Sequence, residues 1–156
     1  MSKKQPFKLG TEIDKAGNSL TVYKCEQLGM SPAYSFFIKS YAETVDMGFA
    51  YPMTCWNDQD CAVIYVTDGD EVVGQMTYNT NSPMAPGFIW IILSSVRPSH
   101  RGQGIYKLMH KYLDQIGQEG NYSGVASYVH VDNRAQLRAL EGVNKKPIFY
   151  VVGKKF

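Results

Sequence analysis

Apolar and polar residues alternate from residue 6 to 26 around a turn at Lys15 to Asn18, which is the pattern of strands with one buried face. From Cys61 to Tyr78, two runs rich in β-forming residues flank Asp68 to Asp70, a turn whose glycine accommodates a positive φ angle. Each region therefore predicts a β-hairpin. The predicted strands are Phe7 to Asp14, Ser19 to Glu26, Ala62 to Thr67 and Val72 to Tyr78.

Three other stretches are typical of helices. Ser31 followed by Pro32 matches an N-cap with proline at the first helical position, and predicts a helix from about Pro32 to Asp46. A second helix is predicted after a glycine turn and ends at Gly117 and Gly120. A short helix at Asn133 to Glu141 is capped by Asp132 or Asn133. The apolar stripe of the second helix is Ile105, Leu108, Met109, Tyr112, Leu113 and Ile116.

The remaining strands are predicted from different signals. Phe88 to Val96 carries no charged residue, which is the pattern of a strand buried on both faces at the centre of a sheet. Tyr122 to Val131 alternates, and Pro147 to Lys155 reads as a closing strand. The segment Gly48 to Asp60 has no clear period, so a loop and a short irregular helix both stay open.

The size and composition favour one domain spanning residues 1–156. The chain is 44% hydrophobic, and its formal charge of +2 is too small to indicate a nucleic-acid or membrane partner. The cysteines Cys25, Cys55 and Cys61 form no CxxC pair, and their odd number argues against a disulfide framework. We therefore expect a cytoplasmic protein without a membrane span, a secretory segment or a metal site.

The turn between Val96 and Tyr106 carries the clearest chemistry. The first turn of a helix leaves N–H groups unpaired, and the helix dipole favours an anion there. Glycines at 102 and 104 remove Cβ atoms that would keep a phosphate away, while Arg101 and Arg97 add positive charge. A pyrophosphate site is predicted, and the alternative is an ordinary strand-to-helix turn.

Two common phosphate motifs do not fit this turn. A P-loop requires a lysine and a hydroxyl residue directly after its last glycine, and nothing after Gly104 supplies them. A dinucleotide fingerprint requires a third glycine, and Lys107 occupies that position. The pyrophosphate ligand must therefore be recognised by another motif.

The residues Arg101-Gly102-Gln103-Gly104-Ile105-Tyr106, preceded by Val96-Arg97-Pro98, resemble the coenzyme A signature of the GCN5-related N-acetyltransferase (GNAT) superfamily. That signature reads Arg or Gln, two residues, Gly, one residue, then Gly or Ala. The order of predicted elements resembles the same fold over residues 6–156. The resemblance implies an α+β fold, a three-layer α/β sandwich with a mixed, mostly antiparallel sheet, flanking helices and a shortened C-terminal strand region.

The resemblance also implies acetyl-CoA as cofactor and an amine as acceptor, on a small molecule or a peptide. The acetyl group would pass by direct attack in a ternary complex. Pantetheine would lie where the central strand splays from its parallel neighbour. The implied cofactor-binding residues are Ser94, Ser95 and Val96 for pantetheine, Arg101, Gly102, Gln103, Gly104, Ile105 and Tyr106 for the pyrophosphate, and Asn133 for the cofactor arm.

The chain departs from the family pattern at three points. Tyr106 replaces a glycine or alanine, so either the helix begins slightly away from the cofactor or the ring points outward. Leu140 stands where the family often has the tyrosine that protonates the leaving thiolate. Only Ile148 to Val152 remains as a clear strand where two are usual, so the sheet edge is either truncated or completed in a homodimer.

The catalytic candidates are His130 and Asp132, near the strand end that would face the acetyl group, and Tyr150 or Tyr128 in place of the absent acid. A surface histidine, a helix cap and packed tyrosines are the alternative interpretations of these residues. Two other functions stay open. One is a non-catalytic module that binds acyl-CoA or a nucleotide, and the other is a protein-interaction domain with an architectural glycine turn.

Overall fold

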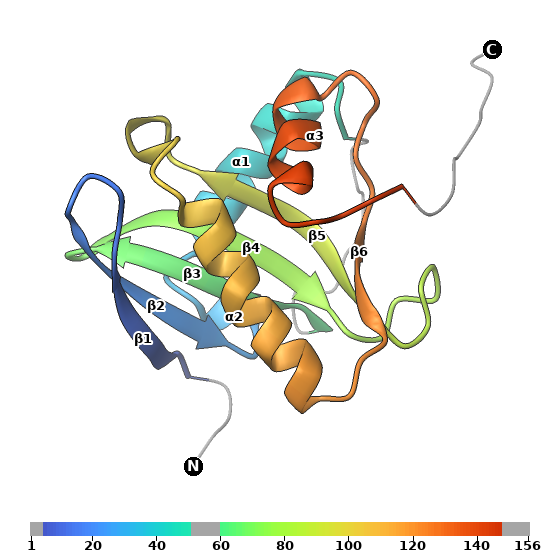
Figure 1. Cartoon of the computed structure of the whole chain (residues 1–156), viewed down its shortest axis with the longest axis horizontal. Helices are drawn as coiled ribbons and strands as arrows, with labels where there is room; N and C mark the ends of the chain where they lie inside the picture. The colour runs from blue at the N-terminus through green and yellow to red at the C-terminus, as the bar shows by residue number, and fades with distance from the viewer. Residues whose placement is uncertain (1–4, 51–59, 148–156) are drawn as a thin grey trace.

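The computed structural model describes residues 5–50 and 60–147, and within them a six-stranded sheet forms the centre of the protein (Figure 1). The spatial order of the strands follows their order in the sequence, and all neighbours are antiparallel except the last pair, which is parallel. The strands are β1 Phe7–Ile13, β2 Ser19–Cys25, β3 Ala62–Asp68, β4 Glu71–Asn79, β5 Phe88–Val96 and β6 Gly124–Ser127.

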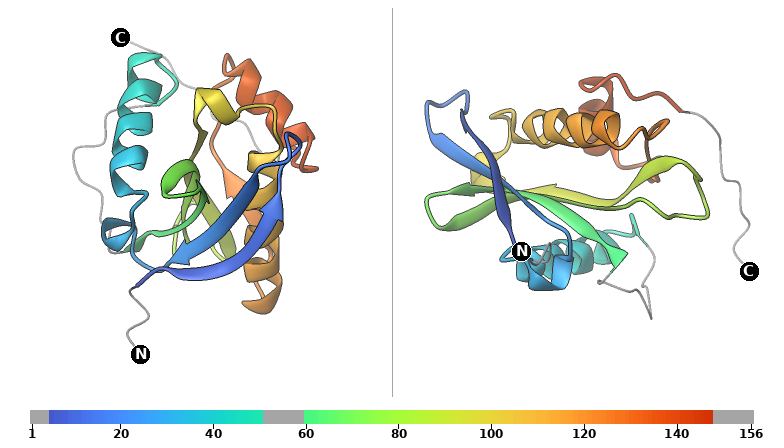
Figure 2. Two further views of the ribbon diagram at one scale, coloured as in Figure 1. Left: turned by 90° about the vertical axis from the view of Figure 1, so that its left-hand side faces the viewer. Right: turned by 90° about the horizontal axis from the view of Figure 1, so that it is seen from below.

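Helices cover both faces of this sheet. The helix α1, Tyr34–Asp46, lies on one face, whereas α2, Ile105–Glu119, and α3, Arg134–Glu141, lie on the other (Figure 2). Short 3-10 turns precede α1 at Leu28–Met30 and α2 at Pro98–His100. The predicted three-layer α+β fold with a mixed, mostly antiparallel sheet is therefore confirmed. None of the described helices is long and apolar enough to cross a membrane.

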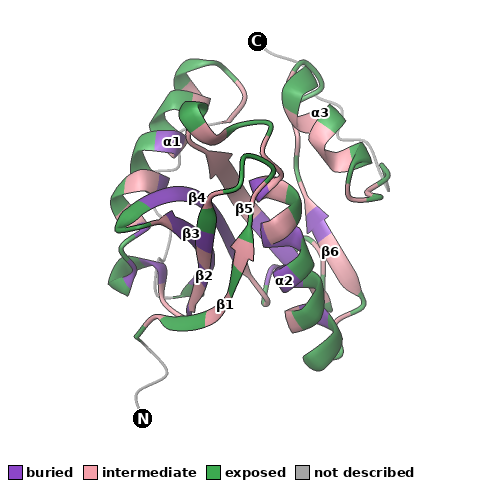
Figure 3. Cartoon of the chain, turned by 60° about the vertical axis from the view of Figure 1, so that its left-hand side comes forward, coloured by how far each residue is buried: buried purple, intermediate pink, exposed green. Residues whose placement is uncertain are grey.

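The core beneath α2 fixes where that helix begins. Ile105 and Met109 are buried in one hydrophobic cluster with the sheet residues Ile64 and Met76. Figure 3 colours the buried parts of α2 and of the sheet purple. At Gly74 of β4, an added Cβ atom would lie 2.7 Å from Cγ2 of Ile105, which is closer than two carbon atoms can pack. The missing side chain lets the first turn of α2 rest directly on β4 and holds it beside the end of β5.

Some predicted boundaries were wrong, for local reasons. The helix α1 begins two residues later than expected because the Ser31 hydroxyl oxygen accepts a hydrogen bond from Ala33 N–H, which makes a turn before the helix. Gly117 lies inside α2, and Gly120 ends it. The alternating stretch Tyr122 to Val131 supplies only the four residues of β6. The closing strand predicted at Pro147 to Lys155 lies outside the described residues beyond Pro147.

Candidate functional site

The parallel strands β5 and β6 separate after a short paired stretch. Phe88 to Ile91 pair with Gly124 to Ser127, and no described strand pairs with the rest of β5 on that side. The divergence is visible in Figure 1, where β6 leaves β5 toward α3. The prediction that β5 is buried on both faces is therefore wrong for its second half, because Ile92 to Val96 are only half-buried.

The register of β4 and β5 determines which main-chain groups face the opening. Arg97 N–H donates to the Val73 carbonyl at 2.8 Å, and Ser95 pairs with Gln75 two residues earlier. Because hydrogen bonding alternates along an antiparallel ladder, the N–H and C=O groups of Ser94 and Val96 point away from β4. They face the side where β6 has already left. The Val96 carbonyl accepts a hydrogen bond from Arg101 Nε there at 3.1 Å, and the remaining polar groups are placed to pair with an extended ligand.

The glycine turn after β5 presents a row of unpaired donors. Gly102 and Gly104 have φ angles of +76° and +91°, and no atom lies within 4 Å of the Cβ position at Gly102. The first hydrogen bond of α2 joins Leu108 N–H to the Gly104 carbonyl. From Gly102 to Lys107, no main-chain N–H has an acceptor among the described residues. This cradle fits a pyrophosphate, as the sequence predicts.

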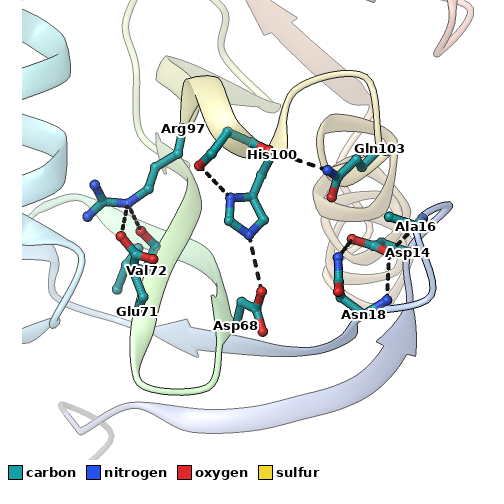
Figure 4. A network of polar contacts seen from close by, with 10 residues as sticks. Asp14, Ala16, Asn18, Asp68, Glu71, Val72, Arg97, His100 and Gln103 are labelled. Carbon is teal, nitrogen blue, oxygen red and sulfur yellow. Dashed lines mark hydrogen bonds and ion pairs between the residues drawn. The ribbon is translucent and has the colours of Figure 1, made fainter.

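Side chains from the turn anchor it to the β3–β4 hairpin (Figure 4). Arg97 Nε donates to the Val72 carbonyl at 2.6 Å and lies 3.1 Å from a carboxylate oxygen of Glu71. His100 Nε2 lies 3.2 Å from a carboxylate oxygen of Asp68. The guanidinium group of Arg97 is thus committed to β4, so the expectation that it adds charge to the anion site is wrong.

Tyr106 points into the protein, so of the two alternatives for this residue the outward-pointing ring is wrong. Its hydroxyl accepts a hydrogen bond from Gln136 Nε2 of α3 at 3.1 Å and lies 3.0 Å from His110 Nε2. The Gln136 amide also lies 3.5 Å from the Ser94 hydroxyl. Burial raises the pKa of Tyr106 to about 12 and lowers that of His110 to about 4, so both rings are neutral near pH 7. This cluster joins β5, α2 and α3.

The two serines predicted to line pantetheine point to opposite faces of the sheet. Ser94 faces α3, whereas the Ser95 hydroxyl accepts a hydrogen bond from Gln75 Nε2 at 3.0 Å. Thr77 donates its hydroxyl hydrogen to Gln75 Oε1 at 2.7 Å, and neither Gln75 nor Thr77 is exposed to solvent. Each serine hydroxyl accepts a hydrogen bond from a glutamine side chain, and the main chain of β5 on its open side is a further group that can contact a ligand.

The structure brings His130 and Asp132 together beyond β6. Asp132 N–H donates to His130 Nδ1 at 3.2 Å, its carboxylate lies 3.7 Å from the same nitrogen, and both side chains are exposed. The His130 ring also packs against Phe49, just after α1, with centroids 5.6 Å apart. Asn133 caps α3, because its Oδ1 accepts a hydrogen bond from Gln136 N–H at 3.1 Å. Tyr150 lies outside the described residues.

Sequence reasoning missed Gln136 and His110. The only signals for them are their helical spacings, three residues after the cap Asn133 and four residues after Tyr106. Those spacings place the side chains on one face of a helix, but they do not show which other element packs against that face. The contacts between the helices arise from tertiary packing.

The site thus combines two parallel strands that separate with a glycine turn that opens a helix. Residues 30–141 match the acetyltransferase (GNAT) family. The chain belongs to this family of acyltransferases, whose acyl donor is acetyl-CoA. No curated protein sequence matches the chain.

Solved structures share this fold at low sequence identity. One is an aminoglycoside acetyltransferase, meta-AAC0020, from an uncultured soil metagenomic sample, with a TM-score of 0.66, 16% identity, and coverage of 88% of this chain and 95% of that one. Another is a ribosomal-protein-alanine N-acetyltransferase from Brucella melitensis, with a TM-score of 0.65, 16% identity, and coverage of 88% and 99%. The aminoglycoside N-acetyltransferase AAC(6')-Iy in complex with CoA has a TM-score of 0.64, 11% identity, and coverage of 86% and 98%.

Proposed function

We propose that the chain transfers an acetyl group from acetyl-CoA to an amine on a small molecule or a peptide. The observation that carries the proposal is the row of N–H groups from Gly102 to Lys107, which have no acceptor in the described part of the chain and follow the point where β5 parts from β6. Similar solved structures include an aminoglycoside acetyltransferase in complex with sisomicin and a ribosomal-protein-alanine N-acetyltransferase. Both descriptions name amine acceptors, which supports this substrate class.

The proposal assigns the pyrophosphate to the glycine turn and the pantetheine arm to the open edge of β5. The amides of Gly102 to Tyr106 and the Arg101 side chain hold the diphosphate, while main-chain groups of Ser94 and Val96 pair with the arm as an added strand would. Acetyl-CoA supplies an activated acetyl thioester when bound. The protein contributes by positioning the two substrates and by directing a strand N–H at the carbonyl oxygen as negative charge develops there.

The proposed proton transfers use residues that follow β6 along the chain. His130 takes the proton of the amine at Nδ1, and the Asp132 carboxylate, 3.7 Å from that nitrogen, stabilises the protonated ring. Tyr150 is proposed to protonate the leaving thiolate, since Leu140 lacks a proton to give. Direct attack by the amine needs no covalent enzyme intermediate, so the arrangement requires no nucleophilic side chain.

Thiol release separates this function from its alternatives. We expect acetyl-CoA to raise the melting temperature and to release free thiol when an aminoglycoside or a peptide amine is added. A rise in melting temperature without thiol release across the amine panel would instead indicate a module that only binds acyl-CoA. With neither effect, the glycine turn would be architectural and the proposal wrong.

Two substitutions of Asn133 separate its capping role from a cofactor contact. Aspartate caps a helix as well as asparagine does, so Asn133→Asp should leave the melting temperature unchanged, whereas Asn133→Ala should cost about 1 kcal/mol of stability. If the side-chain amide also touches the cofactor arm, Asn133→Asp should weaken coenzyme A binding by roughly tenfold, as loss of a hydrogen bond predicts. If Asn133→Asp and the wild type bind coenzyme A with equal affinity in calorimetry, Asn133 caps α3 and does not contact the cofactor arm.

A further inference from the structure

The turn between β1 and β2 lies against the glycine turn that opens α2. Lys15 N–H donates to the Gln103 carbonyl at 3.4 Å, and Lys15 Cε lies 3.9 Å from the Cβ position of Gly104. Figure 4 shows Asp14, Ala16 and Asn18 of this hairpin turn beside Gln103. The fold thus places a lysine from the first hairpin beside Gln103 and Gly104 of the glycine turn.

The Lys15 side chain is uncommitted. It is exposed, and its ammonium group has no ion pair or hydrogen bond with another described residue. The nearby carboxylate of Asp14 is used within the hairpin: it accepts hydrogen bonds from Ala16 N–H at 2.8 Å and from Asn18 N–H at 2.8 Å and Nδ2 at 2.9 Å. Those bonds hold the turn in shape while Lys15 keeps its charge for another partner.

The other cations at this turn already have protein partners. Arg97 is held by Glu71 and the Val72 carbonyl, on the β4 side. Arg101 Nε donates to the Val96 carbonyl at 3.1 Å, so only the rest of its guanidinium group is left for a ligand. A diphosphate carries two negative charges, which Arg101 alone does not balance, and Lys15 lies near enough to Gly104 to supply a second positive charge.

We propose that Lys15 is a ligand of the coenzyme A pyrophosphate, contributed by the β1–β2 turn to the cradle formed by Gly102 to Tyr106. This inference rests on the proposed binding of acetyl-CoA at that cradle. The β1–β2 turn and the glycine turn then contact the diphosphate from two sides. The Lys15–Gln103 main-chain hydrogen bond fixes the distance between the two turns.

Calorimetry with two ligands tests this contact. We expect Lys15→Gln to weaken the binding of coenzyme A and of 3′-dephospho-coenzyme A alike, by about tenfold, as loss of one charge-assisted hydrogen bond predicts. Lys15→Arg should bind within about twofold of the wild type, since it keeps the charge. The matched control is Lys8→Gln, which removes an exposed lysine from β1 and should change neither affinity.

Each outcome decides a different point. If Lys15→Gln binds both ligands as the wild type does, the inference fails while the proposed function stands. If the loss occurs with coenzyme A alone, the lysine contacts the ribose 3′-phosphate and the pyrophosphate assignment is wrong. If the wild type binds neither ligand, the proposed function itself fails and takes this inference with it.

Discussion

Replacing Gly104 by valine is expected to weaken coenzyme A binding by about 100-fold or more, because two or more charge-assisted N–H contacts are lost. The φ angle of +91° at Gly104 is one that a β-branched residue rarely adopts, so the main chain must rotate. Rotation turns the N–H groups of Gly104 and Ile105 away from the diphosphate, and the added methyl groups project toward the cradle. Isothermal calorimetry with coenzyme A measures the loss.

Gly48→Val is the matched control for that strain. Gly48 has a φ angle of +74° with no atom within 4 Å of its Cβ position, and it lies just beyond α1, away from the glycine turn. Both variants should lose about 1–2 kcal/mol of stability from the left-handed conformation. Only Gly104→Val should lose coenzyme A affinity, and an unchanged affinity in that variant would reject the glycine turn as the binding site.

Local signals predicted the elements that frame the site. The bounds of β5 match the uncharged run Phe88 to Val96, and the strands of both hairpins match to within a residue or two. Alternation and turn glycines depend on neighbouring residues in the chain, so a sequence displays them directly. The glycine turn was predicted for the same reason, since its chemistry follows from main-chain geometry within a few residues.

Long-range contacts account for what the sequence could not predict. Whether Tyr106 points outward depends on where α3 lies, and the position of α3 depends on how far β6 follows β5. Lys15 reaches the cradle only because a hairpin far away in the sequence packs beside α2. The burial of β5 was overestimated for a similar reason, because the lack of charge in Ile92 to Val96 does not show that the neighbouring strand ends early.

Acid should destabilise the protein through His110 in a defined pH window. Burial lowers the pKa of His110 from 6.5 to about 4, so the folded protein binds this proton only near pH 4, while the unfolded chain binds it below about pH 6.5. Between those values the unfolded state carries more protons, and stability falls as the pH falls. The total loss of unfolding free energy from His110 is about 3 kcal/mol, close to 1.4 kcal/mol for each pH unit between the two pKa values.

The variant His110→Gln isolates this effect, because a glutamine amide can still pair with the Tyr106 hydroxyl but does not titrate. Denaturant unfolding from pH 7 to pH 4 should show a shallower loss of stability in this variant than in the wild type. Carboxylates such as Asp114 titrate in both proteins, so their contribution cancels in the difference. If the stability of His110→Gln and of the wild type falls equally with pH, His110 is not a buried, neutral residue in the folded protein.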